Sequence, residues 1–381
     1  IADRVQVMRH GAVVESGPVD DIFYKPKHDY TKMLLDSMPR LDRPDREGHA
    51  HAGQIANTKP ILDVEDLKVH FPVKGSGLFA KSKPLRAVDG VSFTLREGET
   101  LGIVGESGCG KSTLARAVLK LLPKTAGTVV WMTRDLGQIS ESDQRKLRKD
   151  LQIVFQDPLA SLDPRRTIGE SIAEPLKTLQ PNLNRNEVKS RVRKIMEQVG
   201  LDPAWINRYP HEFSGGQNQR VGIARAMIVE PKLVICDEAV SALDVSIQSQ
   251  IIDLIMKLQA DSGMSLIFIS HDLSVVRQIS HRVMVLYLGR VVELADRETI
   301  YKDPRHPYTK ALISAVPIPD PKIERTKKRV KLAGDLPSPL DTRAQLSFLK
   351  SKVIDDPDAE QYKPKLIEVA PGHLVAEHDP A

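Results

Sequence analysis

A glycine-rich segment at residues 105–113 narrows the possible folds more than any other feature of this chain. Its sequence, GESGCGKST, fits the pattern G-x-x-x-x-G-K-[ST] and directly follows the short apolar run 101–104. Glycines let successive backbone N–H groups turn inward around phosphate oxygens, and a following helix, predicted over 112–122, points its positive end at them. Lys111 can reach the phosphates and Ser112 can ligate Mg²⁺. We therefore expect an α/β fold in which a strand, this loop and a helix hold a nucleoside phosphate.

Other apolar runs also end in polar residues. The run 233–236 is followed by Asp237 and Glu238, the run 152–155 by Gln156, and LIFIS at 266–270 by His271. Ligands of open α/β sheets lie beyond the carboxyl ends of parallel strands, so these side chains are expected to meet near the phosphate loop. There Asp237 could hold Mg²⁺ through water and Glu238 could polarise an attacking water. Taken singly, Asp237 and Glu238 could simply cap the next turn, His271 would more often be a helix-capping or surface histidine, and Gln156 indicates nothing by itself.

A second candidate anion site precedes a predicted helix. In EFSGGQNQRVGIARAM, Ser214 and two glycines come just before a helix expected to bury Val221, Ala224 and Met227. Small residues at a helix N-terminus leave N–H groups open to an anion such as the γ-phosphate of a nucleotide. On its own, the segment reads as an ordinary serine N-cap followed by a glycine turn.

The chain repeats itself at a distance of 278 residues. Residues 1–39 align with residues 279–317 without a gap, and more than a third of the pairs are identical, among them Glu15 with Glu293 and Tyr30 with Tyr308. A spacing of domain size with nothing similar in between indicates a truncated tandem duplication. We expect residues 1–40 to be the end of a preceding copy, 41–60 a polar linker, 61–321 a complete copy with a helical part at about 157–230, and 322–381 an appended region.

Composition excludes several classes of protein. No apolar run approaches the roughly 18–20 residues that a membrane helix needs. Cys109 and Cys236 are far apart, which leaves neither a disulfide framework nor a sequence-local zinc site and favours a reducing compartment. The net charge of +5 is spread along the chain, so it does not indicate a nucleic-acid partner.

Taken together and in order, these motifs resemble the nucleotide-binding domain of ATP-binding cassette (ABC) proteins, over about residues 61–321 and the fragment 1–40. The resemblance implies a P-loop fold with a RecA-like core, an antiparallel β subdomain and a helical subdomain. It also implies an ATPase whose catalytic residues are Glu238 as the base, His271 as the switch histidine and Gln156 as the Q-loop glutamine.

The resemblance assigns the remaining site residues as well. Asp237 is the Walker B aspartate, Asp244 belongs to the D-loop 241–244, and Ser112, Gln156 and Asp237 are the implied Mg²⁺ site. The signature, which faces the ATP of a partner cassette, is Ser214, Gly215, Gly216 and Gln217, with Phe213 where many members carry leucine. The implied ATP-binding residues are Phe71, stacked on adenine, with Gln156 and the loop residues Gly105, Glu106, Ser107, Gly108, Cys109, Gly110, Lys111, Ser112 and Thr113.

Longer phrases look like the ATPase subunits of the oligopeptide, dipeptide and nickel importers of bacteria. These phrases are VFQDPLASLDPR, CDEAVSALDVSIQ, DPRHPYTKALISAVP and LPSPLD. Members of that group usually carry four cysteines in the tail that bind an iron–sulfur cluster, followed by PGHxVAxH. Here the histidine motif remains at residues 371–378 but no cysteine follows Cys236, so no cluster is expected. The cysteine-free tail most resembles tandem importers of the Yej type, which carry peptides and microcin C; the glutathione importer is the other tandem type.

The implied cofactors are ATP and Mg²⁺. The implied partners are two integral-membrane permease subunits, a periplasmic peptide-binding protein and the preceding cassette of the same chain, at the cytoplasmic face of the bacterial inner membrane. Two cassettes would close on two ATP molecules and reopen after hydrolysis. One alternative is a soluble tandem ABC ATPase of translation or DNA repair, although residues 40–60 form neither a long basic arm nor a zinc module. Another is a regulatory nucleotide binder without turnover, against which Glu238 and His271 argue.

Overall fold

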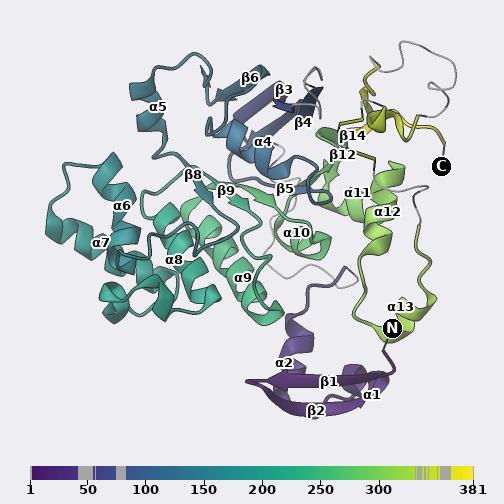
Figure 1. The fold of residues 1–381 in the computed structure, drawn as a ribbon, viewed down its shortest axis with the longest axis horizontal. Coiled ribbons are helices and arrows are strands. Elements are labelled where there is room, and N and C mark those ends of the chain that lie inside the picture. Colours follow the sequence, from purple (N-terminus) through teal and green to yellow (C-terminus); the bar gives the residue numbers. More distant parts are fainter. Residues whose placement is uncertain are drawn as a thin grey trace, which may run out of the picture.

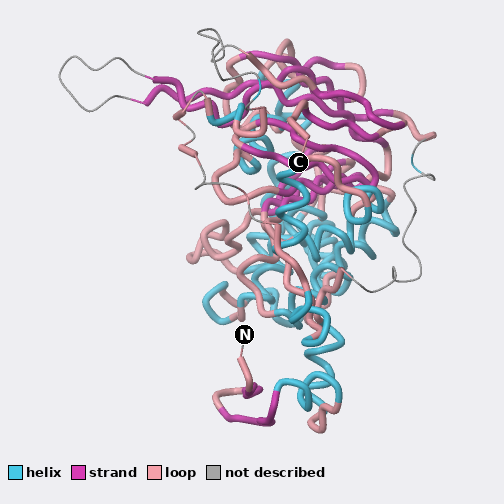
Figure 2. The backbone as a smooth tube through the Cα atoms, turned by 90° about the vertical axis from the view of Figure 1, so that its right-hand side faces the viewer, coloured by secondary structure: helices cyan, strands magenta, loops and turns pink. Residues whose placement is uncertain are grey.

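The computed structural model describes residues 2–41, 57–73, 83–330, 343–349 and 362–380, together with residues 55, 332, 337, 338, 340, 341 and 351. Most of the predicted linker and residues 74–82 lie outside these ranges. Most of the described strands lie in the upper part of the molecule, with helices below them, and residues 2–41, which include two strands, form the lower end (Figure 2).

The larger sheet has eight strands in the order β13-β14-β12-β11-β5-β10-β9-β8. Its five strands from β11 to β8 are parallel, which confirms that the short apolar runs form buried parallel strands. Beyond β11 the sheet continues with β12, β14 and β13, and each of these strands runs antiparallel to the one before it. The bounds are β5 (Thr100–Val104), β8 (Leu151–Val154), β9 (Leu233–Asp237), β10 (Ser265–Ile269), β11 (Arg282–Tyr287), β12 (Arg290–Asp296), β13 (Leu366–Ala370) and β14 (His373–Ala376).

A second, antiparallel sheet of four strands has the order β4-β3-β6-β7. Its strands are β3 (Pro60–Val73), β4 (Lys83–Arg96), β6 (Ala126–Trp131) and β7 (Arg134–Asp135). Helix α4 (Lys111–Val118) lies near this sheet and β5, and the buried residues of all three form one apolar core (Figure 1). This helix is shorter than the predicted 112–122, because Lys120 adopts a left-handed φ of 53°.

The other face of the large sheet is covered by helices. The chain between β8 and β9 is mostly helical, as predicted, and α7 buries Val188, Val192, Ile195 and Met196. The main apolar core joins these helices to α9, α10 and the strands. The helices on this face are α6 (Ile168–Leu179), α7 (Arg185–Gln198), η1 (Pro203–Asn207), η2 (Pro210–Glu212), α8 (Gly215–Met227), α9 (Val245–Ser262) and α10 (Leu273–Ile279). Helix α5 (Glu141–Leu147) precedes β8, and its Leu147 packs against the core that α4 shares with the four-stranded sheet. None of the helices in the described part of the chain combines the length and the hydropathy of a membrane span.

The sequence repeat is also a repeat of structure. Residues 4–37 form two strands and two helices, and each bound recurs 278 residues later, as in Arg4 and Arg282. The first set is β1 (Arg4–Arg9), β2 (Ala12–Pro18), α1 (Val19–Tyr24) and α2 (Asp29–Ser37). The second set is β11, β12, α11 (Arg297–Lys302) and α12 (Pro307–Ala315). Irregular features recur too: both hairpins change register at the same point, between Val7 and Met8 and between Val285 and Leu286.

The N-terminal repeat lies against the body of the molecule. Helix α2 packs on α9, and α1 contacts α13 (Pro321–Thr326). The Tyr24 hydroxyl donates to Asp320 Oδ1 at 2.6 Å, and Arg325 pairs with Asp20 at 3.3 Å. Unlike β11 and β12, however, β1 and β2 form a sheet of only two strands. An isolated pair of strands is marginally stable, so contacts with the body stabilise this segment.

The appended region extends the large sheet. Strand β14 pairs with β12, and β13 pairs with β14. Before them, a short turn η3 (Ala344–Leu346) buries Leu346 and Leu349 in a small cluster with Tyr362. The sequence of this region gave no prediction of its secondary structure, and its strands complete the edge of the sheet next to β12.

Gly102, in the middle of β5, allows α10 to approach the sheet. A Cβ atom at this position would lie 2.4 Å from both Ser280 Oγ and Val276 Cγ1. We expect Gly102→Ala to lower the free energy of unfolding by about 1–3 kcal/mol, because α10 must move away. Gly222→Ala in α8 is the matched control, since a Cβ there meets nothing within 4 Å and alanine favours a helix by about 0.5–1 kcal/mol. Thermal unfolding without nucleotide measures both; equal midpoints for the two variants would contradict the tight α10 contact.

Candidate functional site

The glycine-rich loop leaves the buried end of β5 and closes tightly before α4. Gly105 has φ +153°, and a Cβ there would lie 2.3 Å from Leu286 O. Gly110 has φ +106° at the N-cap of α4, where a Cβ would lie 2.0 Å from Ala87 O. Both positions therefore require glycine. The backbone fold of residues 105–110 matches the predicted loop, with the N-terminus of a helix at its end.

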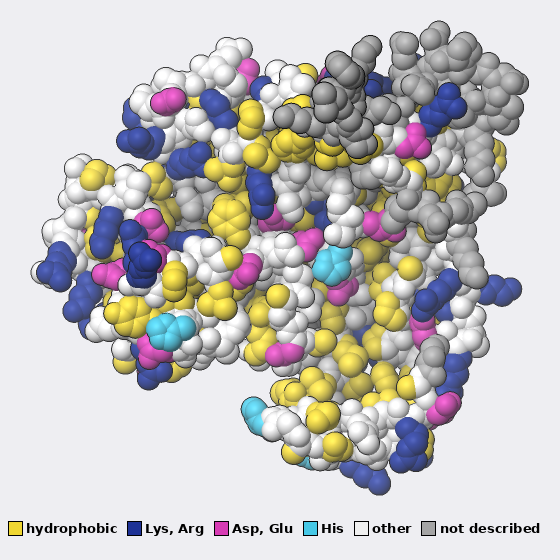
Figure 3. Space-filling view, viewed as in Figure 1, with side chains coloured by type: hydrophobic (Ala, Val, Ile, Leu, Met, Phe, Trp, Pro, Cys, Tyr) yellow, Lys and Arg dark blue, Asp and Glu magenta, His cyan; other side chains and the backbone are white. Residues whose placement is uncertain are grey.

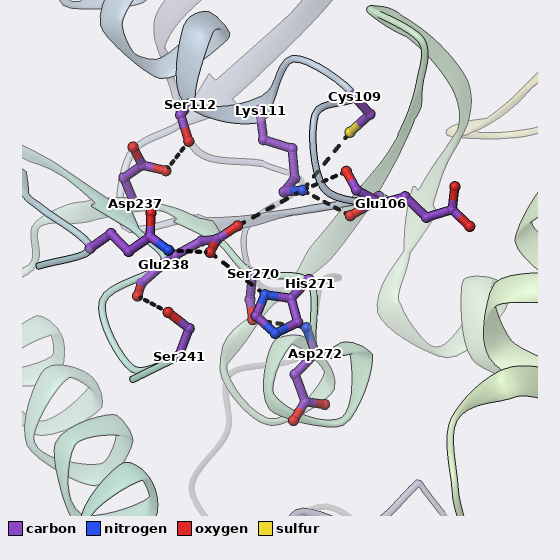
Figure 4. A network of polar contacts seen from close by, with 12 residues as sticks. Glu106, Cys109, Lys111, Ser112, Asp237, Glu238, Ser241, Ser270, His271 and Asp272 are labelled. Carbon is purple, nitrogen blue, oxygen red and sulfur yellow. Dashed lines mark hydrogen bonds and ion pairs between the residues drawn. The ribbon is translucent and has the colours of Figure 1, made fainter. Parts of the chain in front are cut away.

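Lys111 is buried and turned back over the loop. Its Nζ atom donates to Gly105 O at 2.8 Å and to Glu106 O at 3.0 Å, and lies 4.0 Å from Glu238 Oε1. The ammonium thus lies inside the loop, between two carbonyls and a carboxylate (Figure 4). A phosphate entering the loop would offer this cation stronger, charge-assisted partners than the two carbonyls.

The first turn of α4 and the end of β9 meet through a hydroxyl and a carboxylate. Ser112 Oγ donates to Asp237 Oδ1 at 2.7 Å. Burial raises the pKa of the Asp237 carboxyl, and the Ser112 hydrogen bond and the positive charge of Arg116 act against this rise. Both oxygens are hard ligands suited to Mg²⁺, and a divalent cation beside them would favour the ionised carboxylate.

Glu238 is where the ends of three further strands come together. Its Oε2 atom accepts from Gln156 Nε2 at 2.9 Å and lies 3.6 Å from His271 Nδ1. Its backbone N–H donates to Ile269 O at 3.0 Å, which fixes the residue, at φ +49°, beside the end of β10. Gln156, Asp237, Glu238 and His271 therefore come together beside the loop, as predicted. Figure 4 shows Asp237, Glu238 and His271 in this arrangement.

The three residues of the predicted Mg²⁺ site do not all contact one another. Gln156 donates to Glu238, while Asp237 bonds to Ser112, so two of the three residues of the predicted Mg²⁺ site are in direct contact and the third lies beside Glu238. Within the described part of the chain, no cluster of three or more His, Cys, Asp or Glu side chains could hold a metal ion. The oxygens of Ser112 and Asp237 would need phosphate oxygens or waters to complete an octahedral Mg²⁺ shell, as is usual for this ion.

The segment 214–217 is the first turn of α8 rather than a loop before it. Ser214 is the N-cap, its Oγ accepts from Gln217 N at 3.4 Å, and the Gln217 side chain accepts from Ser214 N at 2.9 Å. Behind this turn, the buried Asn218 donates to Pro210 O at 3.0 Å. Ser214 and Gly215 are exposed, so the N-terminus of α8 faces outward.

Two other predicted site residues, Asp244 and Phe71, lie in other elements of the fold. Asp244 is the N-cap of α9 and accepts from Ile247 N at 3.0 Å. Phe71 lies near the end of β3, opposite Leu85 and partly buried against the α4 core. Its role toward adenine stays a prediction.

One neighbour of the loop was not predicted. The hydroxyl of Tyr308, in α12, accepts the hydrogen bond from the Glu106 backbone N–H at 3.2 Å. Glu106 thus directs its N–H toward α12, and its carboxylate points away from Lys111 (Figure 4). Nothing in the sequence relates Tyr308 to the loop, because the two residues are 202 positions apart and tyrosine has no place in the loop pattern.

Cys109 provides a probe of loop occupancy. Its thiol is buried, 3.9 Å from Lys111 Nζ, and burial raises its pKa; burial raises the pKa of Cys236, inside β9, to about 12. Because the thiolate is the reactive form, we expect iodoacetamide labelling to be slow at pH 7, to accelerate as pH rises, and to reach Cys109 well before Cys236. ATP·Mg²⁺ should slow Cys109 labelling. Peptide mass spectrometry measures both rates, and a Cys109 rate unchanged by saturating ATP would show that nucleotide does not cover the loop.

Comparisons with known proteins agree with this geometry. The ABC transporter family matches residues 88–241, and the C-terminal region of oligopeptide/dipeptide transporters matches twice, at residues 14–62 and 292–344. The oligopeptide transport ATP-binding protein OppF of Salmonella typhimurium is 56% identical over 82% of this chain and 94% of its own length. The glutathione import ATP-binding protein GsiA of Escherichia coli K12 is 44% identical over 99% of this chain, which spans 61% of GsiA.

Solved structures show the same fold. The dimeric ATP-binding cassette MJ0796, in a post-hydrolysis state bound to ADP and Pi, is 27% identical with a TM-score of 0.56 and covers 62% of this chain and 99% of its own. The structure of cbiO1 from Clostridium perfringens, part of an ABC transporter complex, has a TM-score of 0.55. The P-loop α/β fold expected from the sequence is thereby confirmed. This chain belongs to the ATP-binding proteins of ABC transporters, a family of ATPases, within the oligopeptide/dipeptide transporter group.

Proposed function

We propose that this chain hydrolyses ATP at residues 105–113 to drive import of peptides or related compounds. The observation that carries the proposal is the convergence of Lys111, Gln156 and His271 on Glu238, beside the loop. Glu238 is the general base for the attacking water, His271 and Gln156 orient that base, and Lys111 neutralises charge on the β- and γ-phosphates. Ser112 and Asp237 hold Mg²⁺, which supplies charge neutralisation at the phosphates when bound.

A complete site requires a second cassette. The outward-facing N-terminus of α8 offers N–H groups to a γ-phosphate held by another cassette. The dimeric state of MJ0796 supports this arrangement. The natural partner in our proposal is a preceding cassette that ends in residues 1–40. Two observations support this partner. The strands and helices of residues 4–37 recur with the same bounds 278 residues later, and the transporter C-terminal region matches a second time, at residues 14–62.

The membrane partners are proposed to dock beside Gln156. A cleft of about 700 Å³ there includes Asp157 and Ala160 in its lining, and reaches Arg116 and Asp237. A second cleft, of about 470 Å³, shares Gln152, Glu174 and Pro175 with it and runs between α5 and α6. Lys and Arg side chains gather over the α5–α7 side of the molecule (Figure 3). A permease segment in these clefts would contact Gln156 and so sense the state of Glu238.

The transported compound is proposed from relatives rather than from the site. The names of OppF and GsiA favour oligopeptides or glutathione, and microcin C-type peptides are a further candidate from the cysteine-free tail. Such a system would include two permease subunits and a periplasmic binding protein, with this chain at the inner face of the membrane. No comparison supports a role in translation or DNA repair.

Glu238→Gln tests the proposed chemistry. The amide keeps the shape but cannot accept a proton, so we expect hydrolysis to fall by about 10²- to 10⁴-fold while ATP remains bound. Trapped ATP should also accumulate paired cassettes, because pairing is favoured by mass action when neither ATP is consumed. ATPase assays, with light scattering after size-exclusion chromatography in ATP·Mg²⁺, measure these effects.

Lys111→Ala and Lys302→Ala provide the control pair. Lys111→Ala removes a buried cation from the loop, and we expect binding of a fluorescent ATP analogue to weaken by at least about 10- to 100-fold. Lys302 is exposed on α11, where it pairs with Glu298, so Lys302→Ala should bind like the wild type. Wild-type hydrolysis by Glu238→Gln would remove this residue from its role, and unchanged binding by Lys111→Ala would refute the loop assignment.

A further inference from the structure

Glu106 connects the phosphate loop to α12. Its backbone N–H donates to the Tyr308 hydroxyl, and its carbonyl accepts from Lys111 Nζ at 3.0 Å. Tyr308 is completely buried and is the second residue of α12. The position of α12 therefore bears directly on the first residue after Gly105 and, through the Glu106 carbonyl, on Lys111.

The start of α12 is formed by local hydrogen bonds that recur in the N-terminal repeat. Glu293 in β12 accepts from Arg305 N at 2.7 Å and from His306 N at 3.0 Å, and His306 Nδ1 accepts from Tyr308 N at 3.1 Å. The N-terminal repeat makes the same bonds with Glu15 and His28, at 2.8, 3.1 and 3.1 Å. The contacts that the C-terminal region makes to the start of α12 are therefore additional to the hydrogen bonds that both repeats share.

The C-terminal region makes such contacts from two separate segments, the first at residues 343–349 and the second at residues 373–378. From the second, His373 Nε2 lies 2.8 Å from Glu293 Oε1, in the buried interior, and the His378 ring lies 5.1 Å from the His306 ring. From the first, Phe348 packs its ring against His306 at 4.9 Å, Tyr287 at 5.3 Å and Tyr308 at 6.3 Å.

The aromatic contacts of Tyr308 also distinguish the second repeat from the first. Tyr287 lies 4.6 Å from the Tyr308 ring, whereas its counterpart Arg9 lies over Tyr30 at 5.0 Å. The Tyr308 ring is thus enclosed by Tyr287 on the sheet and Phe348 from the C-terminal region. This enclosure fixes the direction in which the Tyr308 hydroxyl points.

We propose that the C-terminal region, residues 343–349 and 373–378, positions the phosphate loop through Tyr308 and thereby raises its affinity for nucleotide. Tyr308 is a positioning residue in this account, and the inference rests on the proposed role of residues 105–113. Lys111 must leave the carbonyls of Gly105 and Glu106 to contact phosphate. An anchored Glu106 keeps the loop in shape during that exchange, so less ordering is required when nucleotide binds.

Tyr308→Phe removes one hydroxyl and keeps the ring. Loss of a typical hydrogen bond predicts that ATP affinity weakens by about 3- to 10-fold, with KM raised similarly and kcat within about twofold. Tyr30→Phe is the matched control, because Tyr30 has the same place in the N-terminal repeat and should change nothing. A fluorescent ATP analogue and steady-state ATPase assays on the whole chain measure these values.

A double-mutant cycle tests the route from the C-terminal region. Phe348→Leu should weaken nucleotide binding in the wild type and have no further effect in Tyr308→Phe, because both act on the same hydrogen bond. If Phe348→Leu disrupts folding, His373→Gln, which weakens the contact to Glu293, replaces it with the same expectation.

The outcomes separate the two proposals. Wild type that does not bind the ATP analogue would refute the proposed function itself. Wild-type binding together with unchanged affinity in Tyr308→Phe would overturn only this inference, as would fully additive effects of Phe348→Leu and Tyr308→Phe. An equal loss of kcat and affinity, with a matching fall in melting temperature, would reduce Tyr308 to a purely structural role and would also overturn it.

Discussion

The organisation of this molecule depends on the contacts that the carboxylate of Glu238 makes. It lies within 4.0 Å of Lys111 from the loop after β5, Gln156 from the chain after β8 and His271 from the chain after β10. These groups come together because the parallel strands that carry them end at one edge of the sheet. Strand β5 packs closely on α10 at Gly102, and the loop packs closely on its neighbours at Gly105 and Gly110. This close packing holds the loop in place at that edge of the sheet.

The repeat adds a second level of organisation. Two segments 278 residues apart build the same hairpin and helices, yet only the second lies in a large sheet. Glu15 and Glu293 share the hydrogen bonds that form this unit, and the contacts of His373 with Glu293 and of Phe348 and Glu106 with Tyr308 are what the cassette adds to it. In the second copy the unit is joined to the phosphate loop on one side and to the C-terminal strands on the other.

Much of the site could be predicted from the sequence because its residues belong to local patterns. The loop is contiguous, and Gln156, Asp237, Glu238 and His271 each lie at or just after the end of an apolar strand, so strand topology brings them together. Tyr308 and the C-terminal strands could not be predicted, since their positions depend on tertiary packing between distant segments. The early end of α4 was also missed, because residues 119–122 are as apolar as the helix before them and only the backbone of Lys120 ends it.

The location of the metal ion tests the central claim most directly. Crystals of the Glu238→Gln variant grown with ATP and Mn²⁺ would reveal the ion by its anomalous scattering. The account predicts one strong peak coordinated by Ser112 Oγ, on the side of Asp237, with the β- and γ-phosphates wrapped by residues 107–112 and contacted by Lys111. A peak away from Ser112 and Asp237, or phosphates bound outside the loop, would contradict it.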